Sequence, residues 1–162
     1  MDSLPFGIEG FTLERCDDTD YFMSRIVETV LMSVDENERS FSSLWMPEMG
    51  CVIRNNVLND SYGERFILKE GYDYAGALWV GRSRDQFTFE EIGYVLGIYV
   101  EEGYRRRGIG TELMRSAEEW CRINGLVHLS LNVSDVNEAA IGLYRKCGYV
   151  PQSTVMRKLL RS

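Results

Sequence analysis

The sequence predicts a mixed α/β domain in which helices cover a central sheet. Two observations carry this prediction. Segments with alternating apolar and polar residues, typical of strands, recur in both halves of the chain. Segments with apolar residues at helical spacing lie between them, most clearly over 108–124. The expected order of elements is β-α-α-β-β-β-α-β-α-β.

The individual elements follow from local patterns and from turn and capping residues. Strands are expected over 11–16, 64–71, 72–82, 90–100 and 126–133, with one or two final strands over 148–160. Helices are expected over 21–34, 46–60, 108–124 and 137–147. Asp17–Asp20 offers capping side chains to the first helix, and Pro47 suits the first turn of the second. The two strands over 64–82 are joined near Gly71.

The helix over 108–124 has the clearest pattern in the chain. Five residues at helical spacing form one apolar face: Ile109, Leu113, Ala117, Trp120 and Cys121. Gly125 stands where a C-terminal cap belongs. We therefore expect this helix to pack on the sheet through that face.

Length and composition narrow the class of protein. The 162 residues suit one domain over 1–162, with a loose tip over 1–8. The N-terminus lacks a signal-peptide pattern, and no apolar run approaches the ~18 residues of a membrane span, so we expect a cytoplasmic protein that binds no membrane. The four cysteines form no C-x-x-C pair and His128 is the only histidine, which argues against a metal site. A pI of about 4.8 argues against nucleic-acid binding.

The charge is uneven along the chain. Residues 1–80 carry 6 Arg and Lys against 15 Asp and Glu, whereas residues 81–162 carry 12 against 10. An acidic half and a faintly basic half could suit a cationic partner and an anionic one. The alternative is that most of these charges only form a solvated surface.

A basic, glycine-containing turn stands between the strand over 90–100 and the helix over 108–124. It reads R-x-x-G-x-G from Arg105 to Gly110. The first N–H groups of a helix lack partners and attract anions, and glycines let phosphate oxygens approach the backbone. A dinucleotide fingerprint would need a third glycine where Leu113 stands, and a P-loop would need lysine where Ile109 stands.

A second segment, "NEAAIGLYRKCGY", starts a helix at Asn137 and places Tyr144 two turns later on nearly the same side. Together with "YRRRGIG", it resembles the GNAT superfamily of acyl-CoA N-acyltransferases over 93–160. The resemblance implies a central, mixed and mostly antiparallel sheet of six to seven strands, flanked by about four helices. It also implies a splayed V between the fourth and fifth strands, and Gly97 fits a β-bulge beside it.

The resemblance implies acetyl-CoA as co-substrate, with no metal. Its pyrophosphate would lie on the turn, and its pantetheine arm would pair with the preceding strand like an added strand. The cofactor-binding residues implied are Ile98, Tyr99, Val100, Arg105, Arg106, Arg107, Gly108, Ile109, Gly110, Thr111, Asn137 and Tyr144. Tyr144 would protonate the leaving thiolate, with a structural tyrosine as the alternative.

The general base is not evident from the sequence. The inner strand positions where the family often has a carboxylate hold Tyr94, Leu96 and Gly97. Glu91 is the candidate, acting through a water, although Glu90, Glu91, Glu101 and Glu102 could all be solvated charges at the strand ends. A substrate amine of lowered pKa could need only water.

The resemblance implies transfer of an acetyl group from acetyl-CoA to a primary amine, by direct attack in a ternary complex. The acceptor would be a small cationic amine or a peptide or protein N-terminus. Two alternatives stay open: a catalytically weak acyl-CoA-binding module of the same fold, and a general nucleotide- or anion-binding domain. A homodimer also stays open.

Overall fold

The computed structural model describes residues 1–25, 63–154, 156, 158 and 160. The helix expected over 46–60 lies outside them, as does most of the helix expected over 21–34. The chain forms two compact units, Met1–Asn132 and Val133–Ser162. The single domain expected over 1–162 stays a prediction.

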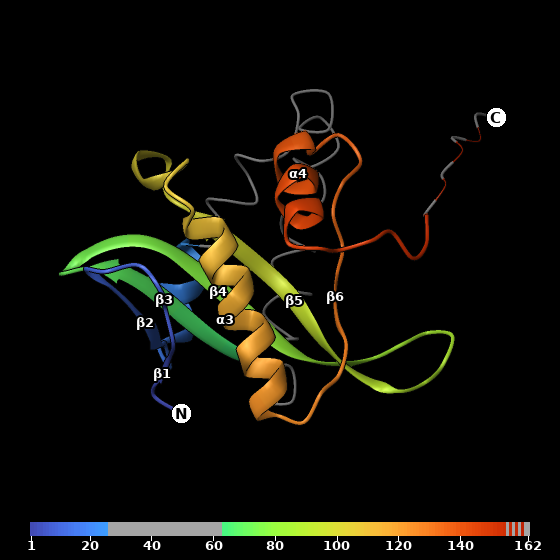
Figure 1. The fold of residues 1–162 in the computed structure, drawn as a ribbon, viewed down its shortest axis with the longest axis horizontal. Coiled ribbons are helices and arrows are strands. Elements are labelled where there is room, and N and C mark those ends of the chain that lie inside the picture. Colours follow the sequence, from blue (N-terminus) through green and yellow to red (C-terminus); the bar gives the residue numbers. More distant parts are fainter. Residues whose placement is uncertain (26–62, 155, 157, 159, 161–162) are drawn as a thin grey trace. The chain divides into compact units, whose positions relative to one another are not determined.

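The first unit is built on a six-stranded sheet in which neighbours in sequence are also neighbours in space, in the order β1-β2-β3-β4-β5-β6 (Figure 1). The strands are β1 (Ser3–Leu4), β2 (Phe11–Arg15), β3 (Glu64–Glu70), β4 (Asp73–Arg84), β5 (Glu91–Val100) and β6 (Leu129–Leu131). All pairs are antiparallel except β5 and β6, which are parallel. The prediction of a mixed, mostly antiparallel sheet is confirmed.

The N-terminal tip is not loose, which corrects the expectation for residues 1–8. β1 pairs with β2, and Leu4 is buried. The buried hydroxyl of Ser116, on helix α3 (Ile109–Ile123), donates a hydrogen bond of 2.7 Å to the carbonyl of Pro5. The N–H of Gly7 also donates to the carboxylate of Glu112, one turn earlier on α3. The sequence pattern of a two-residue strand cannot predict contacts with residues so distant in the chain.

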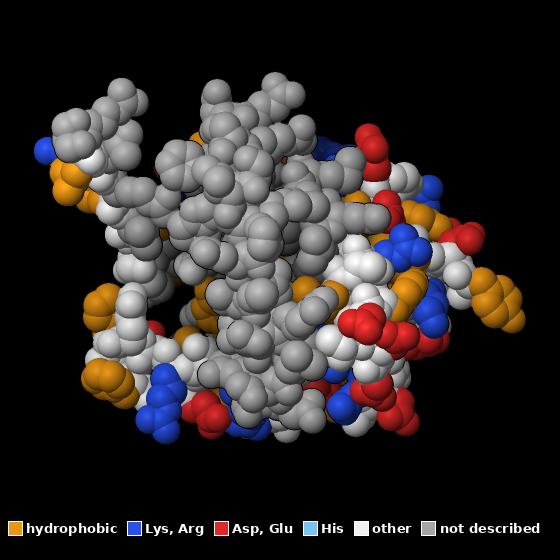
Figure 2. Space-filling view, turned by 180° about the vertical axis from the view of Figure 1, so that it is seen from behind, with side chains coloured by type: hydrophobic (Ala, Val, Ile, Leu, Met, Phe, Trp, Pro, Cys, Tyr) orange, Lys and Arg blue, Asp and Glu red, His pale blue; other side chains and the backbone are white. Residues whose placement is uncertain are grey.

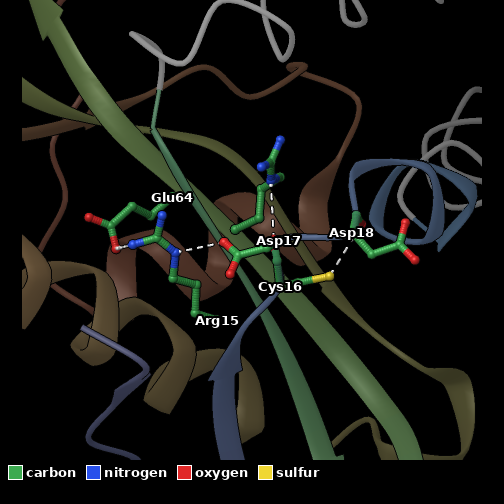
Figure 3. Close-up of polar contacts among 6 residues, drawn as sticks. Arg15, Cys16, Asp17, Asp18 and Glu64 are labelled. Atoms are coloured by element: carbon green, nitrogen blue, oxygen red, sulfur yellow. Dashed lines mark hydrogen bonds and ion pairs between the residues drawn. The ribbon is translucent and has the colours of Figure 1, made fainter.

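The chain leaves β2 through a short polar junction and enters a helix that is described from Thr19 to Arg25. The Asp18 carboxylate accepts the N–H of Tyr21 at 2.9 Å, so it caps the helix as the sequence predicted. Figure 3 shows the rest of the junction: Arg15 binds Asp17 at 2.9 Å, and the Cys16 thiol donates to the carbonyl of Asp18. The junction orients this helix toward one face of the sheet.

The two faces of the sheet carry different helices. On one face Phe22, from the first helix, packs with Ile67, Ala77 and Trp79 in a buried cluster. The other face is covered by α3 (Ile109–Ile123), which crosses the sheet in Figure 1. Leu113 and Ala117 of that helix are fully buried. The sheet is therefore the middle layer of three.

Helix α3 matches the sequence prediction closely. All five residues of its expected apolar face are buried. Gly125 adopts φ +71°, and the N–H groups of Gly125 and Leu126 donate to the carbonyls of Arg122 and Cys121. These two bonds form a Schellman motif, in which glycine is favoured because the backbone is left-handed.

Charges on the described surface are mixed rather than separated. Figure 2 shows acidic and basic side chains side by side on the part of that face that is not grey. Lys69 lies 2.7 Å from Glu14 across β2 and β3, and Arg15 lies 3.8 Å from Glu64. Among the described residues, these pairs agree with the solvated-surface interpretation of the acidic half.

β5 contains the irregularity that defines the site. Val95 pairs with Val80 and Gly97 pairs with Trp79, so Leu96 is an extra residue that bulges out of the ladder. The parallel pairing with β6 covers only Gly93 to Val95. Beyond the bulge, β5 continues to Val100 without pairing to β6, which gives the expected V between these two strands.

The second unit contains α4 (Glu138–Lys146). The Asn137 side chain caps it by accepting the N–H of Ala140 at 3.1 Å. The described residues after this helix, from Tyr149 to Thr154, form neither helix nor strand, so the final strands expected over 148–160 are not found among them. Apolar residues there have no strict alternation, and Pro151 removes a backbone donor.

Candidate functional site

The turn between β5 and α3 presents backbone donors that have no partner among the described residues. A short 3-10 helix, η1 (Glu102–Tyr104), follows β5, and α3 then begins after Gly108. The first N–H bonded within α3 is that of Glu112, which donates to the carbonyl of Gly108 at 3.1 Å. Gly108 brings no capping side chain, so the N–H groups of residues 109–111 point out of the helix end with partial positive charge.

The backbone of the turn is shaped for a close approach. Arg106 and Gly108 both adopt left-handed conformations, with φ of +65° and +80°. A Cβ placed on Gly108 would meet nothing within 4 Å, so the space in front of it is open. Left-handed residues alternating with others make a concave row of N–H groups that can bind an anion.

The three arginines of the turn are exposed and differ in their contacts. The Arg105 Nε donates to the carbonyl of Val100 at 3.0 Å, and its guanidinium lies 5.9 Å from the Tyr99 ring centre. The Arg107 guanidinium lies 5.1 Å from the Tyr104 ring centre. Arg105 thus ties the turn to the end of β5, and all three residues add positive charge to the row of N–H groups.

The last residues of β5 form a strand edge with which no described strand pairs, called here the open strand edge. The N–H of Glu101 donates to the carbonyl of Ala75, on the β4 side. Because backbone groups alternate in an antiparallel ladder, Tyr99 also faces β4, whereas the N–H groups of Ile98 and Val100 face away from it. The N–H of Gly93 points toward β6, where it donates to the carbonyl of His128. Before Leu96, the odd-numbered residues of β5 direct their N–H groups away from β4. After this extra residue, the even-numbered residues do so.

The structure therefore brings two groups of expected residues together: the backbone of Ile98 and Val100, and the turn over 105–111. Tyr99 differs from expectation because its own N–H faces β4. Asn137 and Tyr144 belong to the second unit. The Asn137 carbonyl oxygen is used in capping α4, while its amide nitrogen can still donate. Tyr144 is buried, and this burial, followed by the nearby Cys147 thiol, raises the pKa of its phenol.

Glu91 lies at the opposite end of β5 from Ile98. At about 3.3 Å per residue, the two are separated by roughly 20 Å along the strand. Its carboxylate is 3.1 Å from Arg82 and is more than half exposed. The structure does not bring this residue to the open edge.

Sequence reasoning missed a group of side chains beside that edge. Tyr99 stacks with Tyr74 of β4, with ring centres 6.5 Å apart. The Tyr99 hydroxyl lies 3.5 Å from the Glu101 carboxylate. The signal that could have found this group is the bulge, since it decides which side of the sheet Tyr99 occupies.

Among the described residues, no group of three or more His, Cys, Asp or Glu side chains is arranged to hold a metal ion. None of the described helices combines the length and the hydropathy needed to cross a lipid bilayer.

The fold agrees with the comparisons. The sequence profile of the Acetyltransferase (GNAT) family matches residues 30–149, and the chain belongs to this family. It is 29% identical to a putative [ribosomal protein bS18]-alanine N-acetyltransferase of Bacillus subtilis, over 69% of this chain and 68% of that protein. The structure resembles a putative acetyl transferase from Pyrococcus furiosus, with a TM-score of 0.72, 21% identity and coverage of 93% and 99%.

Some relatives are much longer than this chain. The acetyl transferase GW6a of Oryza sativa is 39% identical over 42% of this chain, and the match spans only 16% of the rice protein. The shared region is therefore a module that occurs within larger proteins as well as in proteins of this size.

Proposed function

We propose that the chain transfers an acetyl group from acetyl-CoA to a primary amine by direct attack in a ternary complex. The observation that carries the proposal is the pairing of an anion-binding turn with an open strand edge, joined by the bond from Arg105 to Val100. The turn suits a pyrophosphate, and the edge suits an amide-containing arm that pairs like a strand. Coenzyme A carries both.

In this proposal the backbone holds acetyl-CoA. The N–H groups of residues 106–111 and the three arginines bind the pyrophosphate, and the outward N–H groups of Ile98 and Val100 bind the arm and polarise the thioester carbonyl. The Asn137 amide nitrogen would donate to the arm. Donors fixed by secondary structure need no rearrangement when negative charge develops on the carbonyl oxygen.

The reaction needs a proton acceptor and a proton donor. The amine loses a proton to water, because Glu91 lies far along the strand, and its nitrogen then attacks the thioester carbon. When the C–S bond breaks, the thiolate takes a proton from Tyr144. This phenol is protonated at neutral pH, as the role requires, and burial raises its pKa further.

The acceptor is proposed to be a small cationic amine or a peptide or protein N-terminus. The second choice is supported by the name of the Bacillus relative, which describes an alanine N-acetyltransferase of a ribosomal protein. We place the reaction in the cytoplasm. The alternative is a module that binds acyl-CoA without turnover, favoured by the lack of a carboxylate at the inner positions Tyr94, Leu96 and Gly97 of β5.

Gly110→Val tests where the cofactor lies. Gly110 is the second residue of α3 and is not left-handed, so valine there adds bulk without backbone strain. We expect calorimetry to show at least a tenfold loss of CoA affinity, while Gly142→Val, a change at a glycine within α4 that no described atom crowds, leaves CoA affinity unchanged. Unchanged affinity in Gly110→Val would contradict the assigned position.

Acetylation of a panel of amines and N-terminal peptides, read out by free thiol, then separates enzyme from module. Turnover with any amine supports the transferase. Tight CoA binding with no turnover across the panel supports the module.

A further inference from the structure

Three side chains beside the open edge of β5 form what we call the tyrosine–glutamate cluster: Tyr74, Tyr99 and Glu101. Tyr99 pairs with Ala77, and both Ala77 and Tyr74 pack in the apolar cluster around Phe22 and Trp79. The tyrosine–glutamate cluster therefore lies on the face of the sheet opposite to α3, one residue away from the outward N–H groups of Ile98 and Val100.

The chemistry of the cluster suits a cation. The two tyrosine rings are stacked on each other at an interplanar angle of 23°, beside the Glu101 carboxylate. The Glu101 carboxylate accepts the hydroxyl of Tyr99, and burial followed by the charge of Glu101 raises the pKa of the Tyr74 phenol. Aromatic faces combined with a partly buried carboxylate attract ammonium and guanidinium groups.

The structure already shows a cation against this cluster. The guanidinium of Arg25, from the first helix, lies 4.9 Å from the Tyr74 ring centre and 5.5 Å from that of Tyr21. The buried hydroxyl of Tyr74 finds no hydrogen-bond partner among the described residues. Buried hydroxyls are normally satisfied, so this oxygen has capacity for a polar ligand.

We propose that the tyrosine–glutamate cluster binds a positive charge on the acceptor, separate from the amine that is acetylated, and that Arg25 competes for this place. The inference rests on the proposed function, because it locates the acceptor beside the strand edge that would hold the thioester. It selects acceptors with two or more cationic groups, of the diamine or polyamine class, over amines with an apolar tail.

The test is equilibrium binding of two amines of similar length, 1,4-diaminobutane and n-pentylamine, measured by calorimetry with excess CoA present. Wild type should bind the diamine at least tenfold more tightly, as expected for one charge-assisted contact. Glu101→Gln should remove most of this preference. Glu102→Gln is the matched control, because Glu102 is the next residue, also acidic and exposed on η1, and should keep the preference.

Two more variants test the roles of Tyr99 and Arg25 separately. Tyr99→Leu removes a ring and should weaken diamine binding, which covers the case in which Glu101→Gln does not fold. Arg25→Gln removes the competing cation and should tighten diamine binding by roughly three- to tenfold, since a salt-screened partly exposed charge is displaced.

Equal affinity of wild type for both amines, or no binding of either, would overturn the proposal. So would weaker diamine binding in Arg25→Gln, since Arg25 would then build the site rather than compete for it. Because binding is measured without turnover, a chain that binds the diamine but never acetylates it would count against acetyl transfer and leave the cation subsite supported.

Discussion

Replacing Gly93 by alanine tests the packing that sets β5, β6 and α3 against one another. An alanine Cβ at this position would lie 2.2 Å from the Sγ of Cys121 and 3.1 Å from the Cδ1 of Leu129. The first distance is far below 3.0 Å, which real Cβ contacts essentially never reach. Cys121 is 4% exposed, so its sulfur has no solvent space to move into.

Overpacking of a core by one methyl group typically costs about 1–3 kcal/mol, and the closeness of this contact favours the upper half of that range. For a chain of this size, about 2–3 kcal/mol lowers the melting temperature by roughly 4–12 °C. Urea unfolding and scanning calorimetry would measure both values. Gly103→Ala is the control, because its Cβ would meet nothing within 4 Å and should change stability by no more than about 0.5 kcal/mol.

A double-mutant cycle identifies the clash itself. Adding Cys121→Ala to Gly93→Ala removes the sulfur, so the pair should be more stable than the sum of the single changes by about 1–2 kcal/mol. Recovery should be incomplete because Leu129 remains close. If Gly93→Ala is as stable as wild type, or the double variant shows no coupling, the assigned packing of α3 on β5 is wrong.

Three further outcomes are expected. Tyr144→Phe should lower kcat by about 10²–10⁴-fold with little change in folding. Because burial raises the pKa of this phenol, the wild-type enzyme should keep its general acid, and hence its kcat, until the pH exceeds about 10. Near-full kcat in the variant, with chemistry rate-limiting, would make Tyr144 a packing residue. Asn137→Asp keeps the oxygen that accepts the N–H of Ala140 but loses the amide donor, so KM for acetyl-CoA should rise at unchanged melting temperature. Asn137→Ala should raise KM and also lose about 1 kcal/mol of stability. An unchanged KM in both variants would show that Asn137 does not contact acetyl-CoA. Ser116→Ala should leave the Pro5 carbonyl unsatisfied, costing about 1–3 kcal/mol and exposing the first strand to proteolysis, which an unchanged cleavage rate would contradict.

Elements with strong local signals were predictable. The face of α3, its glycine cap and the Asp18 cap depend on residues close in sequence, and all three were found where expected. The family followed in the same way, because its two segments have recognisable local patterns.

Features that depend on distant partners were not predictable. β1 is too short for alternation to be read, and it is held by contacts with Ser116 and Glu112, more than a hundred residues away. The bulge was expected at Gly97, and the structure places the extra residue at its neighbour Leu96. A one-residue bulge at either position leaves Tyr99 on the same side of the sheet. Its stacking partner Tyr74 depends on the register between β4 and β5, so the tyrosine–glutamate cluster could not be derived before that register was known.

Because of the extra residue at Leu96, the main chain and the side chains at the end of β5 face different parts of the proposed site. After it, the main chain of Ile98 and Val100 faces the open edge, while the side chain of Tyr99 faces Tyr74. A main-chain donor survives almost any substitution, whereas a side chain is exchanged by a single codon change. Acceptor preference can therefore diverge by point mutation at this strand without altering how the acyl donor is held, but insertion or deletion of one residue would disturb both at once.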